Sequence, residues 1–350
     1  MAADASASTL APRFKRPSFI TAVGLAFVAA LVLLMIKEAT VSPSQFVQTT
    51  LIGLTNGCVY ALIALGYTLV YGILELINFA HGDVFMLGGM FAITIGTHIF
   101  GLHHGMGPVT VLVVFGTLIL TMLACGSINA TIEFVAYRPL RSAPRLAPLI
   151  TAIGVSFIIQ DVGLIWKGPE YVTAPDVFPH SNVFSIGGVD YQWNHLIVVI
   201  ITIPVLLALL WLVQQTKQGK AMRATAQDKD AAAIMGINVN RTISFTFLIA
   251  GALAGAAGTL YALWATTVRF DQGFQLGLIA FTAAVLGGIG NLPGAVLGAV
   301  TIGLIQSWNE GLPWHMPGSD WTQSIVFSIL ILILVFRPEG LLGEKTPEGG

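Results

Sequence analysis

Long apolar runs separated by short polar segments dominate the hydropathy pattern of this chain. An apolar stretch of about 17–25 residues can cross the hydrocarbon core of a bilayer as an α-helix. The pattern therefore predicts an all-α fold, a polytopic transmembrane bundle of about ten segments with discontinuous helices among them. The predicted segments are 18–36, 45–71, 82–100, 108–135, 148–166, 192–213, 241–265, 274–289, 293–309 and 321–336.

A polar, helix-breaking segment, Asn78-Phe-Ala-His81-Gly-Asp83, separates the apolar runs 46–74 and 84–100. Broken backbone at membrane depth must be buried in protein or line a cavity, because lipid offers it no hydrogen-bond partner. Ionisable groups at such depth are functional candidates. We therefore predict that this segment lines a transport path. A structural alternative stays open, in which Asn78 caps the new helix and Asp83 stabilises its positive end.

A second, uncharged break runs from Gly287 to Gly294 and contains Pro293. In transporters, paired interruptions of this kind point to a binding site near the middle of the membrane. Asp161 lies inside another predicted span and is a further candidate. The predicted substrate path comprises Asn78, His81, Asp83, Asp161, Thr282 and Asn291.

Glycine also recurs at the i, i+4 spacing, as in Gly53/Gly57 and Gly251/Gly255. Small residues at this spacing let membrane helices approach closely. We interpret these pairs as packing positions rather than as parts of a site.

Composition excludes a soluble domain. Charged residues are 9% of the 350 residues, against about 25% in ordinary soluble domains. The hydrophobic fraction is 55% and the mean hydropathy is +0.82. Cys58 and Cys125 both fall inside apolar runs and are interpreted as buried hydrophobic residues.

The distribution of basic residues indicates the topology. If the N-terminus is cytoplasmic, 13 of the 16 Lys and Arg residues lie in inner segments, and only Lys37, Lys167 and Arg269 lie outside. Because basic residues favour the cytoplasmic side, both termini are predicted to be cytoplasmic. The inner residues are Arg13, Lys15, Arg16, Arg138, Arg141, Arg145, Lys217, Lys220, Arg223, Lys229, Arg241, Arg337 and Lys345.

The chain divides into a disordered tail at 1–17, an uncleaved first helix at 18–37, a transmembrane domain at 44–343 and a cytoplasmic tail at 344–350. The outer loop 167–191 is either a docking surface or a solvated loop. The inner loop 214–240 is basic and strongly polar, and Gly236 is a natural stop for a short helix within it.

The other ionisable groups carry weaker signals. We expect Glu133 to form an interfacial ion pair with Arg138, and Glu75 is either an interfacial acid or a path residue. A metal site at His98, His103 and His104 is not predicted, because no Cys, Asp or Glu accompanies them. The chain has no Gly-x-x-x-x-Gly-Lys-[Ser/Thr] loop and no hydrolase motif, so no catalytic residues are predicted.

Several segments in order resemble the permease subunits of high-affinity branched-chain amino-acid ABC importers of the LivH type. The resemblance covers about residues 46–343. Asp83 stands where Glu is common in that family, and Glu75 where a small or apolar residue is usual. The segments that carry the resemblance are Tyr60–Gly72, Ile77–Asp83, Ile132–Pro139, Ala152–Ser156, Met235–Asn238, Ala280–Gly290 and Phe336–Gly343.

The resemblance implies a bacterial cell-membrane complex that contains a second permease subunit, two cytoplasmic ATPases and an extracytoplasmic solute-binding protein. ATP and magnesium would be used by the ATPases, so no cofactor is expected on this chain, and membrane lipid but no nucleic acid is expected as a partner. Asp230-Ala-Ala-x-x-x-Gly236 resembles the coupling motif of importer permeases, although Asp replaces Glu and the downstream Leu-Pro is absent. The predicted coupling residues are Arg223, Asp228, Asp230, Ala231, Ala232 and Gly236.

The expected function is inward transport of branched-chain or related aliphatic amino acids by alternating access. A urea or short-amide permease is an alternative, because relatives with those cargoes share the Asn-x-Ala-His-Gly element. An autonomous channel or secondary transporter is a third possibility, and the basic inner loop argues against it.

Overall fold

A computed structural model describes residues 33, 35–37, 39–101, 108–141, 143–144, 146–175, 181–312 and 318–343. The chain forms two compact units, Met1–Pro43 and Ser44–Gly350, and the second is described below. The predicted tails 1–17 and 344–350, most of the predicted first helix, and Arg145, His103 and His104 lie outside the described residues.

Each of the other nine predicted spans corresponds to one helix of the structure. They are α2 (Pro43–Leu74), α3 (Ala80–Thr94), α4 (Pro108–Ile132), α5 (Leu146–Lys167), α6 (Trp193–Gln215), α9 (Val239–Ala265), α10 (Gln272–Gly287), α11 (Leu292–Gly311) and α12 (Thr322–Phe336). A π-helix at Ile95–Ile99 extends α3, and a π-helix at Glu133–Tyr137 and a 3-10 turn at Arg138–Leu140 extend α4.

Among the described residues, seven helices are long and apolar enough to cross a membrane, by length and composition alone. The seventh of these is α12 together with the 3-10 turn Ser319–Trp321 before it, 18 residues in all. Helix α10, with 16 residues, is a shorter apolar helix, and α11 is not among the seven. The structure therefore confirms a polytopic helical protein, whereas the total of about ten segments stays a prediction.

Four short strands were missed by the all-α prediction. Strands β2 (Asn182–Ile186) and β3 (Val189–Gln192) form a hairpin, and β1 (Val172–Thr173) pairs with β4 (Thr267–Val268). The hairpin turn is Gly187–Gly188, with φ of 61° and 83°. Two-residue hairpin turns need positive φ, which glycine supplies without strain. The described part of the outer loop 167–191 therefore contains strands that the sequence analysis did not predict, and the choice between a docking surface and a solvated loop stays open.

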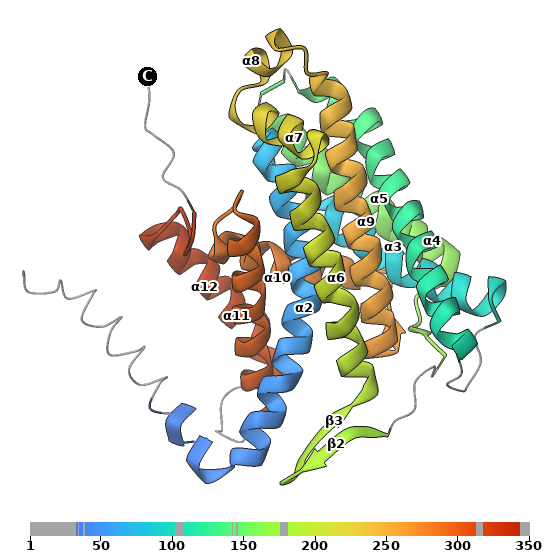
Figure 1. The fold of residues 1–350 in the computed structure, drawn as a ribbon, viewed down its shortest axis with the longest axis vertical. Coiled ribbons are helices and arrows are strands. Elements are labelled where there is room, and N and C mark those ends of the chain that lie inside the picture. The colour runs from blue at the N-terminus through green and yellow to red at the C-terminus, as the bar shows by residue number, and fades with distance from the viewer. Residues whose placement is uncertain are drawn as a thin grey trace, which may run out of the picture. The chain divides into compact units, whose positions relative to one another are not determined.

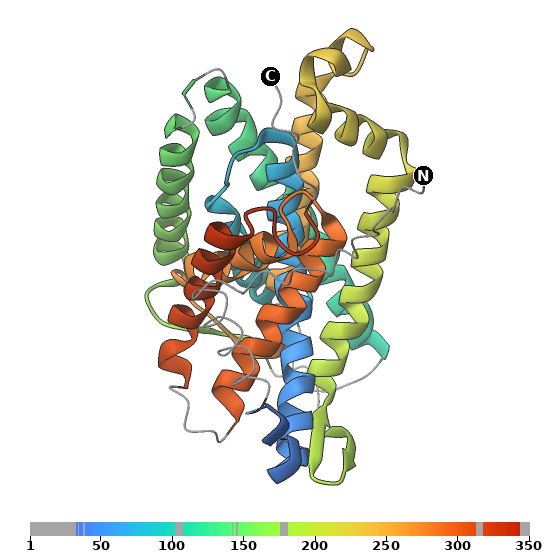
Figure 2. The ribbon, with the colours of Figure 1, turned by 90° about the vertical axis from the view of Figure 1, so that its left-hand side faces the viewer.

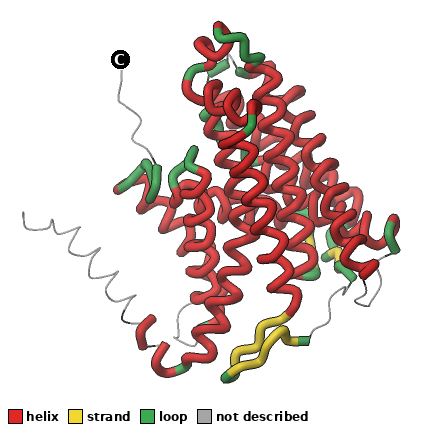
Figure 3. The backbone as a smooth tube through the Cα atoms, viewed as in Figure 1, coloured by secondary structure: helices red, strands yellow, loops and turns green. Residues whose placement is uncertain are grey.

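The long helices separate two ends of this unit. Helix α6 joins the β2–β3 hairpin at one end to α7 (Lys217–Gln227) and α8 (Lys229–Ile234) at the other (Figure 1). Figure 3 shows the same arrangement by secondary structure, with β2 and β3 far from α8. Helix α7 runs from the end of α6 toward α9, as Figure 2 shows from the side.

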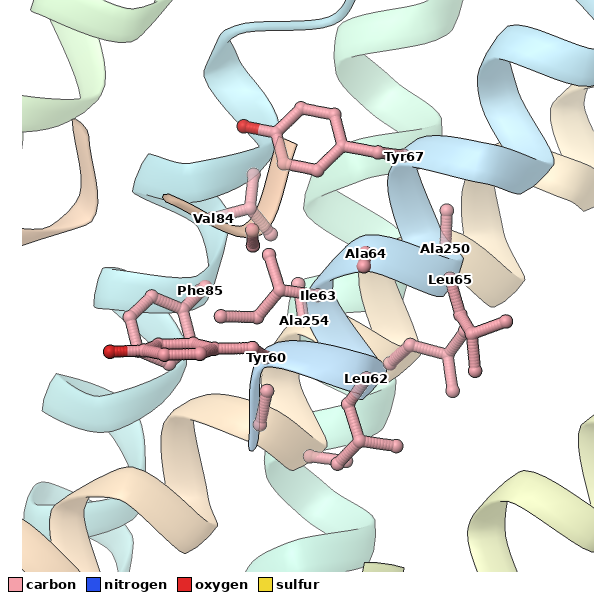
Figure 4. Packing of buried hydrophobic residues seen from close by; sticks show 14 of the residues in the cluster. Tyr60, Leu62, Ile63, Ala64, Leu65, Tyr67, Val84, Phe85, Ala250 and Ala254 are labelled. Carbon is pink, nitrogen blue, oxygen red and sulfur yellow. The ribbon is translucent and has the colours of Figure 1, made fainter. Parts of the chain in front are cut away.

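The core lies where α2, α3 and α9 meet. Ile63 of α2 faces Val84 and Phe85 of α3, while Ala250 and Ala254 of α9 line the same region (Figure 4). These side chains are almost fully buried. Burial on several sides explains why α2 reads as a continuous apolar run rather than an amphipathic one.

Small residues allow the helix backbones to touch. A Cβ on Gly57 would lie 2.7 Å from Cα of Val300 on α11, and one on Gly255 would lie 2.7 Å from the Thr121 carbonyl oxygen on α4. No side chain fits at such distances, so the predicted packing role of Gly53/Gly57 and Gly251/Gly255 is confirmed.

Candidate functional site

The polar break between α2 and α3 lies inside the bundle. Helix α2 ends at Leu74 and α3 begins at Ala80, where the His81 imidazole packs directly on Gly66 of α2. Gly66 lies eight residues before the end of α2. At a rise of 1.5 Å per residue, the start of α3 therefore lies beside a point on α2 that is about 12 Å from the end of that helix. The predicted polar break is therefore present, and it is covered by protein, as backbone at membrane depth requires.

Asn78 joins this break to the end of α4. It is 2% exposed, and its Oδ1 accepts a hydrogen bond of 2.7 Å from the Tyr137 hydroxyl. The N-cap of α3 is Phe79, which has no side-chain capping bond. The interpretation of Asn78 as a helix cap is therefore wrong, because its side chain is committed to Tyr137.

His81 is fully buried between helices. Its ring lies edge-on to Tyr67 of α2, with 4.9 Å between the ring centroids. Tyr67 also packs edge-on to Phe281 of α10, at 5.8 Å. His81 thus belongs to an aromatic contact that links α3, α2 and α10.

Asp83 is a buried carboxylate one turn into α3. Ser156 of α5 donates to its Oδ2, and Gln160 Nε2 donates to Oδ1 at 3.2 Å. Asp83 is 0% exposed, and no ion pair to it is present among the described residues. A buried charge without a cation is costly. This site is therefore suited to a ligand group that carries a proton or a positive charge.

The space beside Asp83 is closed in this conformation. A Cβ on Gly273 of α10 would lie 2.8 Å from Asp83 Oδ1, and one on Gly82 would lie 2.8 Å from Cα of Gly277. The backbones of α3 and α10 are in contact there. A ligand can reach the carboxylate only if α10 or α5 moves.

The structure does not bring the other predicted path residues to Asp83. The Asp161 side chain is exposed, although the preceding Gln160 contacts Asp83. The Thr282 hydroxyl is buried and donates to the Leu278 carbonyl within α10. Asn291 caps α11 by accepting from the Gly294 amide, and its Nδ2 donates to the Leu342 carbonyl.

The second predicted break is present between α10 and α11. Gly288 and Gly290 have φ of 107° and 96°, which strongly favours glycine. The amides of Leu341 and Leu342 donate to the carbonyls of Leu286 and Gly287, so the C-terminal segment closes the end of α10. A Cβ on Gly72 would lie 3.8 Å from Cα of Gly290. The second break therefore lies beside the last turn of α2.

The predicted coupling residues lie in α7 and α8. Arg223 donates to the Val213 carbonyl at the end of α6. Asp228 caps α8, accepting at 2.9 Å from the amides of Asp230 and Ala231. Asp230 and Ala231 are exposed, whereas Ala232 is buried. Arg223 and Asp228 thus hold the ends of α6 and α8 through hydrogen bonds to the backbone, although both are exposed, and Asp230 and Ala231 add to the exposed surface of α8.

Gly236 ends α8. Its φ is 85°, and its amide donates to the Ala233 carbonyl while the Ile237 amide donates to the Ala232 carbonyl. This paired closure with a left-handed residue is a common helix terminus. Nothing lies within 4 Å of a Cβ built on Gly236. Glycine is therefore needed for backbone conformation rather than for space.

Two exposed apolar residues on this loop were missed by the sequence analysis. Ile234 is 86% exposed and Met235 is 81% exposed. They lie between Ala232 and Gly236, inside the segment that resembles the coupling motif. That position was the sequence feature from which their exposure could have been predicted. These two neighbouring apolar side chains lie at the exposed end of α8, outside the apolar spans.

Glu133 pairs with Arg141 rather than with Arg138. Arg141 donates to Glu133 Oε1 and, at 2.5 Å, to Asn240 Oδ1, and the Ser244 hydroxyl donates to Glu133 Oε2 at 2.5 Å. The π-helix at Glu133–Tyr137 places Arg138 over the Phe134 ring, 5.3 Å from its centroid. The predicted Glu133–Arg138 pair is therefore wrong, and the buried carboxylate links the α4–α5 turn to α9.

At the opposite end, the loop between α9 and α10 carries an ion pair. Arg269 donates to both carboxylate oxygens of Asp271 and lies 5.1 Å from the centroid of the Tyr171 ring. The hydrogen bond from Arg269 lowers the pKa of Asp271. Together with the β1–β4 pairing, these contacts hold the outer loop against the start of α10.

Long apolar helices around a buried polar break, with a separate loop of short helices, are the architecture of a membrane transport subunit. The model of one family, described as the branched-chain amino acid transport system permease component, matches residues 49–335. The chain belongs to this family and is a multi-pass membrane protein.

Curated relatives match over almost their whole length. The high-affinity branched-chain amino acid transport system permease protein BraD of Pseudomonas aeruginosa is 38% identical over 87% of this chain and 98% of that protein. The corresponding protein LivH of Escherichia coli K12 is 37% identical, over 87% and 97%. The solved structure of PsaBC from Streptococcus pneumoniae in complex with Fab aligns with a TM-score of 0.44 and 12% identity, over 88% of this chain and 97% of that chain.

Proposed function

We propose that this chain is the membrane subunit of an ATP-driven importer that moves branched-chain or related aliphatic amino acids into the cell. The observation that carries the proposal is the family match at 49–335, with relatives named as branched-chain amino acid permeases that align end to end. The buried, uncompensated carboxylate of Asp83 supports it, since every amino-acid cargo carries an ammonium group.

In this proposal Asp83 meets the substrate ammonium when α10 separates from α3. Coulomb attraction is strong in a water-poor site, so one carboxylate can select a cationic group. Phe281 packs against both Tyr67 and Phe79, and these rings would offer apolar surface to an aliphatic side chain. Asn78, His81 and Thr282 belong to the proposed path, whereas the positions of Asp161 and Asn291 support other roles.

Coupling to ATP hydrolysis is assigned to α8. Two cytoplasmic ATPases would bind ATP and magnesium, and the exposed surface of Ala231, Ile234 and Met235 would contact one of them. Closure of the ATPases would then move α7 and α8 as a rigid unit, a common device in switching proteins. A second permease subunit and an external binding protein complete the proposed complex.

The proposed topology has about ten membrane segments and both termini in the cytoplasm. It puts α7 and α8 on the cytoplasmic side, where ATPases can reach them, and the β2–β3 hairpin on the outer side, where a binding protein can. The bias of basic residues supports this orientation.

Uptake in cells tests the cargo. A strain that lacks this chain is compared with the same strain carrying it, using labelled leucine, isoleucine, valine and urea at equal concentration. The proposal expects restored uptake of the amino acids and none of urea. Restored urea uptake without leucine uptake would assign the chain to the amide branch instead.

A further inference from the structure

A groove lies between α4, α7 and α9, at the end of the bundle that carries the inner loop 214–240. This loop contains α7 and α8 and is called the coupling loop below. It encloses about 660 Å³, within the range of about 300–1,000 Å³ that small-molecule sites occupy. Ala130 of α4 and Ala221 of α7 form its two sides, and α9 forms its floor.

The end of the groove nearest the coupling loop is polar and carries an unpaired positive charge. Arg241 lines it and is exposed, and in the part of the chain that the structure describes its guanidinium has no hydrogen bond or ion pair. Gln218 contributes an amide to the same lining. The nearby acid, Glu133, is already held by Arg141 and Ser244, so it does not neutralise Arg241.

Along α9, which we call the floor of the groove, the lining changes from the polar residues Arg241, Thr242 and Ser244 to the apolar residues Phe245 and Leu248. Arg241, Phe245 and Leu248 have the i, i+4, i+7 spacing of one helix face. Seven residues of helix extend about 10 Å. Leu248 is 37% exposed inside an apolar helix long enough to span a membrane. The groove therefore runs from a cationic end at the membrane surface toward hydrocarbon depth.

We propose that this groove binds one anionic phospholipid, with its phosphate at Arg241 and Gln218 and an acyl chain along Phe245 and Leu248. A basic pocket between membrane helices at the cytoplasmic surface is a site of the kind that anionic headgroups occupy. A cytoplasmic protein surface fits less well, because the floor extends into the hydrocarbon region. Bound there, the lipid bridges α4 to α7, the helix that precedes α8 in the inner loop 214–240.

Lipid binding to the purified, delipidated transporter complex tests the proposal. Phosphatidylglycerol and phosphatidylcholine with identical acyl chains are titrated, and the bound lipid is counted by native mass spectrometry. One phosphatidylglycerol should bind in preference to phosphatidylcholine. Because one basic residue near the surface contributes about 1 kcal/mol, R241Q should weaken that binding about fivefold.

Matched variants separate this site from general charge effects. K167Q removes a charge at the far end of α5, whose 22 residues extend about 33 Å, and should leave the affinity within about twofold because that distance exceeds the Debye length. L248W keeps Arg241 and fills the apolar floor, so it should also weaken binding. The proposal is overturned if R241Q and K167Q behave alike, or if L248W has no effect.

Two further outcomes also contradict it. Displacement of the lipid by millimolar inorganic phosphate would mean a simple anion site with no acyl-chain contact. Failure of the complete complex to bind phosphatidylglycerol at Arg241 would mean that the ATPases cover the groove. All these readouts measure binding, so they stand apart from the identity of the transported cargo.

Discussion

The Asp83 carboxylate is buried beside two neutral donors, Ser156 and Gln160, with no cation paired to it among the residues described. Asp83→Asn keeps the size of the side chain and removes its charge. A hydrogen bond to a charged group contributes about 1.5–3 kcal/mol, so loss of the charge should lower leucine uptake at least about tenfold. Uptake is measured at equal membrane levels of the variant and the parent.

Asp161→Asn is the control for this variant. It lies on the same helix as Ser156 and Gln160, but its side chain is exposed and does not reach Asp83. Uptake by Asp161→Asn should stay within about twofold of the parent. Equal losses in the two variants, or full uptake by Asp83→Asn, would remove the proposed ammonium contact.

Glu75 holds a backbone conformation that suits glycine. Its φ is 57°, its side chain is exposed, and its amide donates to the Tyr71 carbonyl at the end of α2. A left-handed conformation costs a residue with a Cβ about 1 kcal/mol or more. Glu75→Gly should therefore raise the thermal unfolding midpoint in detergent and leave uptake unchanged. A drop in uptake with no gain in stability would instead make Glu75 a path residue.

The residues of the candidate site show which of its features could be predicted from the sequence. The segment at Asn78–Asp83 was predictable because a polar break between two apolar runs has few physical explanations. The partners of its side chains were not, since Tyr137, Ser156 and Gln160 come from distant helices. Asp161 failed to join them for a local reason, because one residue along an α-helix rotates the side chain by about 100° away from Gln160.

Between elements, the Glu133–Arg141 pair fastens the α4–α5 turn to α9. The exposed fractions of these side chains are 0% for Glu133 and 19% for Arg141. Removing one partner of a buried pair leaves an uncompensated charge and costs about 3–5 kcal/mol. Arg141→Ala should destabilise the protein by that order, measured by thermal unfolding in detergent.

The double variant Glu133→Gln with Arg141→Ala checks this interpretation. Since the glutamine carries no charge, the double variant should lose less stability than Arg141→Ala alone. A double variant that is as unstable as the sum of the two single variants would mean that the pair itself contributes nothing.

The proposed role of α8 in coupling transport to ATP hydrolysis can be tested at Gly236, where an added Cβ would meet no neighbouring atom within 4 Å. Gly236→Val should abolish ATP-driven uptake while the subunit still inserts and assembles, because valine resists positive φ. Gly236→Asn should retain more uptake, since asparagine tolerates the left-handed region. If both variants transport normally, α8 is not the coupling element.

At this scale the sequence predicted the helices well and the connections poorly. Apolar runs indicated each span, and the Gly/Pro break at 287–294 indicated where α10 ends and α11 begins. The β2–β3 hairpin was overlooked because alternation over four or five residues is a weak signal beside 20-residue apolar runs. The π-helix after α4 left no signal in the hydropathy pattern, and neither did the pairing of Glu133 with Arg141 instead of Arg138.

In the molecule as a whole, the break between α2 and α3 lies at the same end of the bundle as α7 and α8, and the closed site at Asp83 follows that break in the chain (Figure 1). The family could be recognised from the order of its motifs, and the match at 49–335 bears that out. The cargo and the state of the path could not be read from sequence, because both depend on how α3, α5 and α10 meet.

The most direct test of the central claim is labelled-leucine uptake into proteoliposomes that contain the purified complex, its binding protein and enclosed ATP. The account predicts uptake that requires both ATP and the binding protein and that disappears with Gly236→Val. Leucine uptake by this chain alone, without ATPases or ATP, would contradict it and make the chain an autonomous channel or carrier.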